Sequence, residues 1–323
     1  MKIIIILLVN VIIEIFYIMY NDFDLDLHNN SEDLILYTGK FIKEEQEINE
    51  IYISRKYKIK KVIVFDLDET IGSFGDFYKL WEIVDNYNIN FEELLDLYPE
   101  FLRHGILNIL EFIYFKKLQK LCKIYLYTNN QILLNSNEKS PTDWVLKIAD
   151  FLSKKICQNS EQLFDQLICA FKINNKKIEI KRTTYTKTHN DFIRCTLLPK
   201  KTEICFIDDK YFSGMNNERI YYIQPRSYIH YLNSSTIIER FLSSSIFQNI
   251  SSAEIQHRIT SKIYDNYGND YKNIITKSQI ERDIAISRKM MNYIREFFYL
   301  TMKKTKTRRN RSRSIKNMTK RKI

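Results

Sequence analysis

The sequence predicts an α/β fold with a parallel central sheet. Three short apolar runs, KVIVF (61–65), CKIYLYT (122–128) and EICFID (203–208), have the composition of strands that are buried on both faces. Helical patterns separate these runs, and strands that alternate with helices form parallel sheets. Hydrophobic residues make up 45% of the 323-residue chain, which is enough for a core that needs no disulfide or metal support.

Two segments between the predicted strands carry helical periodicity. Residues 91–121 contain two helical stretches, interrupted near Pro99 and Gly105, and residues 143–157 form an amphipathic helix that begins near Asp143. Residues 232–300 contain no further core strand and have the pattern of helices. We therefore expect an α/β domain over 61–232 and a helical extension over 233–302.

The N-terminal residues form an unusual apolar segment. The sequence MKIIIILLVNVIIEIFYIMY (1–20) is long enough to cross a membrane as a helix. Glu14 weakens this interpretation, because a carboxylate at mid-bilayer is unfavourable by roughly 2.5–3.5 kcal/mol. A membrane anchor, an ordinary buried segment and a cleaved signal peptide remain open. Residues 21–60 have the pattern of an irregular connector, acidic at first and then basic.

The net charge of +11 is concentrated at the C-terminal end. Residues 303–323 contain eleven basic and no acidic side chains, so the rest of the chain is neutral overall. Such a tail is expected to be disordered and to contact nucleic acid or an anionic membrane surface, or to serve as a nuclear localisation signal. A solubilising tail is the alternative. The location is left open between cytoplasm, nucleus and membrane.

Polar side chains follow each of the three predicted strands. Asp66 and Asp68 come directly after the first strand, Thr128 ends the second, and Asp208 and Asp209 end the third. In an open parallel sheet, ligands bind beyond the carboxyl ends of the strands. Each group alone is also compatible with a helix cap or a solvated turn. Together they favour one site for a phosphoryl group and a metal ion.

Paired carboxylates after a buried strand suit phosphoryl transfer. Asp66 and Asp68 are two residues apart, so their side chains are expected to point to the same side of an extended backbone. One ionised carboxylate can attack phosphorus, and the other can protonate the leaving oxygen and then activate water. Mg²⁺, which prefers oxygen ligands, would offset the negative charge.

These segments resemble a known phosphatase superfamily. The order Asp66-Leu67-Asp68-Glu69-Thr70, then Thr128, then Asp208-Asp209 is similar to that of the haloacid-dehalogenase (HAD) superfamily. The D-L-D-E-T wording and FLRHGILNILEFI (101–113) resemble its branch that contains the phosphatases of the RNA polymerase II carboxy-terminal domain. In this chain, His104 replaces the proline of that branch's R-P-G segment. The resemblance covers roughly residues 61–231.

The resemblance implies a fold and an open site. The expected fold is a Rossmann-like three-layer sandwich with a parallel central sheet. Only about fifty-seven residues separate the first and second motifs, which leaves room for a small helical insertion over roughly 75–100 but for no large cap. An open site of this kind suits a macromolecular substrate such as a phosphoprotein.

The resemblance also implies residue roles. Asp66 would be the nucleophile and a Mg²⁺ ligand, and Asp68 would be the general acid and base, with its backbone carbonyl on the metal. Thr128 would bind the phosphoryl group. Asp208 and Asp209 would complete the metal site, although the D-[DN]-S-P motif of that branch is replaced here by Asp-Asp-Lys-Tyr.

A lysine is also needed to neutralise the phosphoaspartate. Lys187 lies where the branch carries K-D-L, but the Asp-Leu is absent here, so Lys181, Lys200 and Lys201 remain alternatives. The function predicted from the sequence is a Mg²⁺-dependent phosphatase that acts on phosphoserine or phosphothreonine in proteins. A nucleic-acid end phosphatase and a catalytically weak adaptor that binds a polyanion or a partner are the alternatives.

Overall fold

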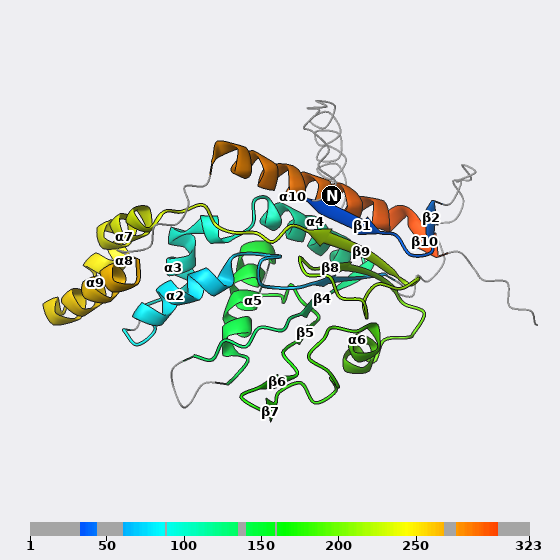
Figure 1. Cartoon of the computed structure of the whole chain (residues 1–323), viewed down its shortest axis with the longest axis horizontal. Helices are drawn as coiled ribbons and strands as arrows, with labels where there is room; N and C mark the ends of the chain where they lie inside the picture. The colour runs from blue at the N-terminus through cyan, green and yellow to red at the C-terminus, as the bar shows by residue number, and fades with distance from the viewer. Residues whose placement is uncertain are drawn as a thin grey trace, which may run out of the picture. The chain divides into compact units, whose positions relative to one another are not determined.

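The computed structural model describes residues 33–43, 61–87, 89–134, 140–158, 160–267 and 276–302 (Figure 1). The predicted anchor (1–20) and basic tail (303–323) lie outside these residues. The described residues from Leu34 onward belong to one compact unit. Within the described ranges, no helix combines the length and the apolar character needed to cross a membrane.

A mostly parallel sheet of six strands forms the centre of this unit. The strand order is β1-β9-β8-β3-β4-β5, and only β1 runs antiparallel to its neighbour. The three strands expected from the sequence are confirmed as β3, β4 and β8. The bounds are β1 (Leu34–Tyr37), β3 (Lys61–Phe65), β4 (Cys122–Tyr127), β5 (Gln166–Ile168), β8 (Glu203–Ile207) and β9 (Ile220–Pro225).

The central strands are buried on both faces, as their continuous apolar runs predict. Val62 and Val64 of β3 belong to one cluster of buried residues, together with Phe192 from helix α6 (His189–Thr196). Ile63 and Phe65 point to the opposite face and join the larger core cluster. This alternation places hydrophobic packing on both sides of the sheet.

On the face of the sheet that carries Ile63 and Phe65, helices complete the larger core cluster. Helix α4 packs on β4 and on α5, and α10 packs on β9 and β1. The predicted interruption near Pro99 and Gly105 is present, because Gly105 adopts a φ of +67° immediately before α4. The bounds are α4 (Ile106–Leu118), α5 (Asp143–Ile156) and α10 (Lys277–Tyr299).

A second group of helices combines two distant parts of the chain (Figure 1). The expected helical segment between the first two predicted strands is present, and α2 is its first helix. Helix α2 packs against α9, and α9 packs on α7. The members are α2 (Phe74–Val84), α3 (Phe91–Leu97), the 3-10 helix η1 (Pro99–Phe101), α7 (Ser234–Ser243), α8 (Ser245–Gln248) and α9 (Ala253–Tyr267).

Within the expected irregular connector (21–60), the structure describes residues 33–43, and these contain two short strands. Leu34–Tyr37 is strand β1 of the central sheet, paired with β9. After a turn at Gly39, β2 (Phe41–Lys43) pairs with β10 (Leu300–Met302), which follows α10 directly. The helical extension is therefore not merely appended: its last helix packs against the sheet that carries the predicted motifs, and the strand that follows pairs with β2.

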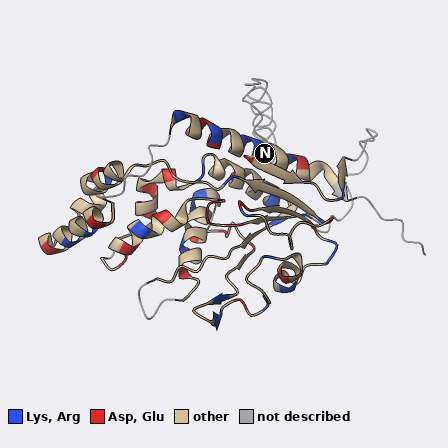
Figure 2. Ribbon diagram, in the orientation of Figure 1, with Lys and Arg blue, Asp and Glu red and all other residues tan. Residues whose placement is uncertain are grey.

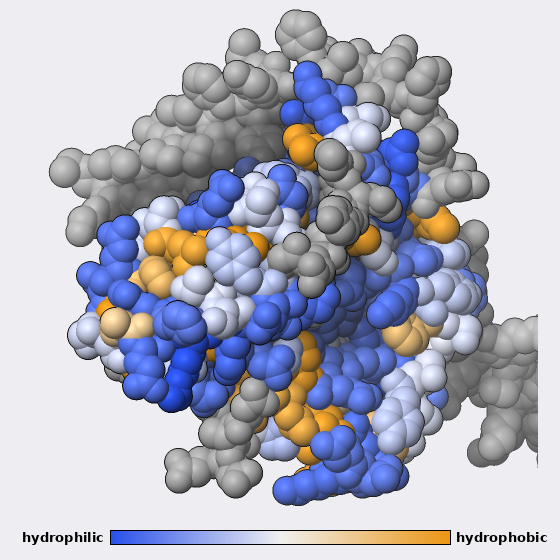
Figure 3. All heavy atoms as spheres, turned by 60° about the vertical axis from the view of Figure 1, so that its left-hand side comes forward, coloured by the Kyte–Doolittle hydropathy of each residue, from blue (hydrophilic) through white to orange (hydrophobic). Residues whose placement is uncertain are grey.

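The outer surface is mostly polar. A short hairpin of β6 (Lys172–Ile173) and β7 (Lys176–Lys177) carries basic side chains (Figure 2). The view that brings the group of α2, α3 and α7–α9 forward shows a largely hydrophilic surface with separate hydrophobic patches (Figure 3).

Candidate functional site

Asp66 and Asp208 lie side by side at the carboxyl ends of neighbouring parallel strands. In the register of β3 and β8, Phe65 pairs with Ile207, so the two aspartates occupy the next level. The backbone N–H of Asp66 donates to the carbonyl of Ile207 at 2.9 Å, which continues the ladder beyond the last strand residue. The apolar strands thus fix the positions of both carboxylates.

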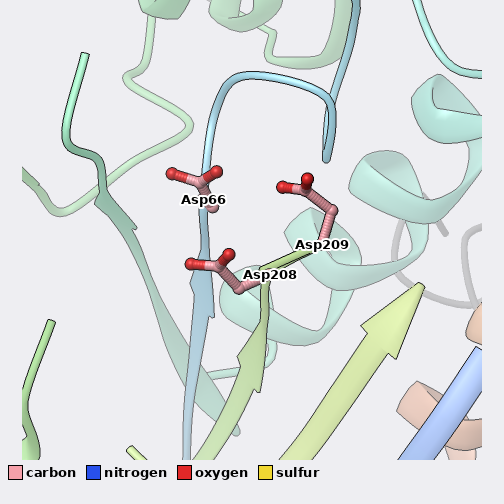
Figure 4. Close-up of side chains that lie close together, drawn as sticks. All are labelled: Asp66, Asp208 and Asp209. Atoms are coloured by element: carbon pink, nitrogen blue, oxygen red, sulfur yellow. The ribbon is translucent and has the colours of Figure 1, made fainter. Parts of the chain in front are cut away.

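A third carboxylate, that of Asp209, completes a compact group (Figure 4). One oxygen from each of Asp66, Asp208 and Asp209 lies within 4.8 Å of the others, and all three residues are buried. Thr70 Oγ1 donates to Asp209 Oδ1 at 3.0 Å, and Ser227 Oγ donates to Oδ2 at 2.6 Å. These bonds hold the third carboxylate toward the other two, and the group could bind a metal ion.

Lys187 connects two of these carboxylates. Its ammonium donates to Asp66 Oδ1 at 2.5 Å and to Asp208 Oδ2 at 2.6 Å, and its side chain is buried. The three alternatives left by the sequence, Lys181, Lys200 and Lys201, are all exposed. Of the four lysines considered, the structure therefore brings Lys187 to the aspartates.

The charges of this group do not balance. Three buried carboxylates face a single ammonium. Burial raises the pKa of Asp66 and of Asp208, and Lys187 opposes this rise in both cases. Burial works against the charged form of Lys187, but the two aspartates outweigh it and raise its pKa. A divalent cation held by carboxylate oxygens would remove this excess negative charge, so the donor set fits one.

The carboxylate of Asp68 lies outside this three-carboxylate group. It accepts two hydrogen bonds from Asn130 Nδ2, at 3.1 Å and 2.9 Å. Burial, followed by the negative charge of Asp66, raises the pKa of Asp68 to about 7, although the amide of Asn130 opposes the rise. By surface area the residue is only half-buried. Asp68 can therefore exchange protons with its surroundings near neutral pH.

Thr128 follows β4, as expected, and is fully buried. Its hydroxyl oxygen accepts the N–H of Asn130 at 2.9 Å, which shapes the turn after the strand. Asn130 thus links the ends of β3 and β4, because its backbone contacts Thr128 and its side chain contacts Asp68. Asn130 was not among the residues predicted from the sequence, although it directly follows Thr128 and Asn129 in a polar run at a strand end.

A buried arginine holds the loop that follows β3. Arg103 is 1% exposed, and its guanidinium donates to the carbonyls of Thr70 and Glu69, each at 2.6 Å, and of Arg226 at 2.8 Å. Glu69 adopts a φ of +56°, a strained conformation for a residue with a side chain. Burial lowers the pKa of Arg103 to about 10, so it stays charged at neutral pH. We infer that Arg103 stabilises this turn.

A second buried arginine, Arg182, holds the loop after β4 in the same way, by donating hydrogen bonds to its carbonyls. It is fully buried and donates to the carbonyls of Thr128 at 3.0 Å and Cys169 at 2.8 Å, and to Asn129 Oδ1 at 2.7 Å. The sequence analysis missed both arginines as site residues. Arg103 lies in the segment that resembles the R-P-G motif, whereas no local pattern marks Arg182.

Comparison of the chain with models of protein families, with curated proteins and with solved structures finds no match.

Proposed function

We propose that the chain is a Mg²⁺-dependent phosphatase of the HAD type that forms an aspartyl-phosphate on Asp66. The observation that carries this proposal is the buried ammonium of Lys187 between Asp66 and Asp208, inside a group of three carboxylates. Buried, unbalanced charges destabilise a fold, and strongly perturbed pKa values cluster at functional sites.

Mg²⁺ fits the donor set. Asp66, Asp208 and Asp209 would hold it through carboxylate oxygens. The resemblance to the HAD superfamily adds the backbone carbonyl of Asp68 as a further ligand. Bound there, the ion would neutralise negative charge on the carboxylates and on the phosphoryl group.

In the first chemical step, Asp66 acts as the nucleophile. A carboxylate oxygen of Asp66 attacks phosphorus, and the bond between phosphorus and the leaving oxygen breaks. Asp68, in its protonated form, gives its proton to that oxygen, so the alcohol departs neutral. Lys187 and the hydroxyl of Thr128 hold the phosphoryl group in place during the transfer.

In the second step, water regenerates the enzyme. The ionised carboxylate of Asp68 takes a proton from water, whose oxygen attacks phosphorus. The bond between phosphorus and Asp66 breaks, which releases inorganic phosphate and restores both carboxyl groups. A group with a pKa of about 7 suits this alternation, because it can be protonated in one step and ionised in the next.

The substrate class that suits this site is phosphoserine or phosphothreonine in a protein. The insertion between β3 and β4 is the place where a lid over the site would be built. Its residues Phe77, Trp81 and Leu94 are instead buried in the main core cluster. Because these helices are packed into the core, we infer that they do not form a separate lid over the carboxylates, which suits a polypeptide substrate.

The first test uses the full-length chain and p-nitrophenyl phosphate. We expect turnover with Mg²⁺, none with EDTA, and a loss of at least about 10³-fold in Asp66→Asn, since the nucleophile is removed. Asp150→Asn is the matched control, because Asp150 is an exposed carboxylate on α5. Its turnover should equal that of the wild type.

Substrate comparison completes the test. Phosphoserine peptides and oligonucleotides with 5′- or 3′-terminal phosphates are assayed in parallel, and the higher kcat/KM identifies the substrate class. A folded sample that hydrolyses none of these with Mg²⁺ present would overturn the phosphatase proposal and leave the adaptor as the explanation of the fold.

A further inference from the structure

A groove of about 710 Å³ lies between α6 and the loop that joins β8 to β9. Both walls begin at the candidate site. The loop starts at Asp208 and Asp209, and α6 starts two residues after Lys187. The residues that carry the argument are His189, Arg194, Lys200, Gly214, Glu218 and Arg219.

Lys187 joins the groove to the site. Its ammonium contacts Asp66 and Asp208, whereas its backbone lies against the groove wall. A Cβ atom added to Gly214 would lie 3.1 Å from the carbonyl oxygen of Lys187. The N–H of His189 also donates to the carbonyl of Gly214 at 3.0 Å. The groove and the reacting carboxylates are therefore one lysine side chain apart.

The groove is positively charged. Arg194, Lys200 and Arg219 line it. Arg194 is paired with Asp191 at 3.5 Å, whereas within the described part of the chain neither Lys200 nor Arg219 forms an ion pair. Glu218 is its only lining carboxylate, and a salt bridge with Lys40 neutralises that charge. The first turn of α6, beginning at His189, adds the partial positive charge of a helix N-terminus.

We propose that this groove binds an acidic stretch of the substrate polypeptide, next to its phosphorylated residue; this proposal rests on the proposed phosphatase function. The groove is far larger than one phosphate ion, so it suits an extended segment. No phenylalanine, tyrosine or tryptophan lines it. Single-stranded nucleic acids bind by stacking bases on such rings, so the lining favours a polypeptide.

The test compares two phosphoserine peptides of equal length, one with four glutamates beside the phosphoserine and one with four glutamines. We expect the wild type to prefer the glutamate peptide by on the order of tenfold in kcat/KM at low salt, since each exposed ion pair contributes up to about fivefold. The preference should shrink as the ionic strength rises. Fluorescence anisotropy of the labelled peptides measures binding independently of turnover.

Two pairs of substitutions locate the effect. The double variant Lys200→Glu and Arg219→Glu should abolish the preference in both kcat/KM and binding, whereas Lys200→Arg with Arg219→Lys should retain it. The matched control is Lys176→Glu with Lys177→Glu, which changes the net charge equally on the exposed β6–β7 hairpin. This control should keep the wild-type preference.

Each other outcome counts against the groove. An equal loss in both charge-reversed variants would indicate a long-range charge effect, and a wild type that binds both peptides equally would remove the basis of the proposal. An unphosphorylated DNA strand of equal charge can also be tested as a competitor of the labelled glutamate peptide. If the DNA binds more strongly than the peptide, and this binding is lost in the variant with Lys200→Glu and Arg219→Glu, the groove is assigned to nucleic acid. Turnover of p-nitrophenyl phosphate without a peptide preference would overturn this inference and leave the phosphatase proposal intact.

Discussion

At the scale of single residues, Asp66 and Asp68 occupy different environments although only one residue separates them. Asp66 is buried and contacts the ammonium of Lys187. The carboxylate of Asp68 accepts hydrogen bonds from the neutral amide of Asn130, and burial, followed by the negative charge of Asp66, raises its pKa to about 7. Burial raises the pKa of Asp66 and the ammonium of Lys187 opposes that rise, whereas the environment of Asp68 favours a group that exchanges protons at neutral pH.

This difference predicts how the rate depends on pH. Transfer from a phosphoserine peptide needs the protonated form of Asp68, so the single-turnover rate should fall above pH 7, by about tenfold per pH unit. The p-nitrophenolate leaving group departs without a proton, so the aryl phosphate should lack this decline. Rapid-quench measurements with excess enzyme isolate the step. The same decline with both substrates would contradict the role of Asp68.

The amide of Asn130 offers a second variant for the same measurement. Its hydrogen bond stabilises ionised Asp68 and lowers the pKa, so Asn130→Ala should move the decline to higher pH. Asn216→Ala, at an exposed position outside the site, is the control and should leave the profile unchanged. A profile that does not move in Asn130→Ala would show that the amide does not set the protonation of Asp68.

The predicted residues that the sequence located without ambiguity lie at or just after the end of an apolar strand. Asp66, Thr128 and Asp208 could be located because strand and motif are contiguous. The apolar strands do not locate Lys187, which the resemblance alone placed ahead of three other lysines, because the path of the chain before α6 decides which long side chain reaches Asp66. Arg182 was missed because its partners are mainly backbone carbonyls, which leave no trace in the sequence.

At the scale of elements, α10 connects the C-terminal region to the sheet. Met290, Ile294 and Phe297 recur at helical spacing and are fully buried. The sheet also binds the end of this helix: the ammonium of Lys61, on β3, donates to the carbonyls of Phe297 and Leu300, at 2.7 Å and 2.6 Å. The C-terminal end of α10 is thus bound to the start of the strand that leads to Asp66.

Ile294→Ala tests whether α10 is an integral part of the fold. We expect a loss of about 2–5 kcal/mol in the free energy of unfolding, because the substitution opens a cavity in a packed core. Arg288→Ala, at an exposed position of the same helix, should change it by less than about 0.5 kcal/mol. Urea denaturation measures both. If Ile294→Ala changes the free energy of unfolding as little as Arg288→Ala does, α10 is not an integral part of the core.

The elements that the sequence did not predict are those whose partners are far away in the chain. Residues 34–37, LILY, are too few to show a strand period, and β1 forms only because β9 offers an open edge. Helical periodicity predicted the last helix correctly, but periodicity does not say which surface a helix covers. Strand pairing at the edge and docking of α10 therefore required the structure.

At the scale of the whole molecule, the unbalanced carboxylates couple stability to pH and to metal binding. Burial raises the pKa of Asp66 and Asp208 in the folded chain above their ordinary value of 3.8. The folded state therefore holds these protons more tightly than the unfolded state does. Without metal, the stabilising contribution of the protonated carboxyls is present at low pH and is lost as pH rises from about 4 through the folded pKa values.

Mg²⁺ should reverse this loss, because it takes the place of the protons. At a free concentration about 100 times its Kd, a ligand that binds only the folded chain stabilises it by about 2.7 kcal/mol. We expect the melting temperature with Mg²⁺ to exceed that with EDTA by several degrees at pH 7–8, and the difference to shrink toward pH 4–5. Scanning calorimetry over this pH range measures both curves.

Substitutions at the site separate specific binding from a general effect of salt. Asp208→Asn removes one ligand oxygen and one buried charge, so it should raise the melting temperature in EDTA and abolish most of the gain with Mg²⁺. Asp150→Asn, at an exposed position, should keep the wild-type difference. If Mg²⁺ and EDTA give the same melting temperature for the wild type at pH 8, the three carboxylates do not hold the ion. Their charge would then be balanced by protons and Lys187 alone, and an ionised nucleophile at Asp66 would need another explanation.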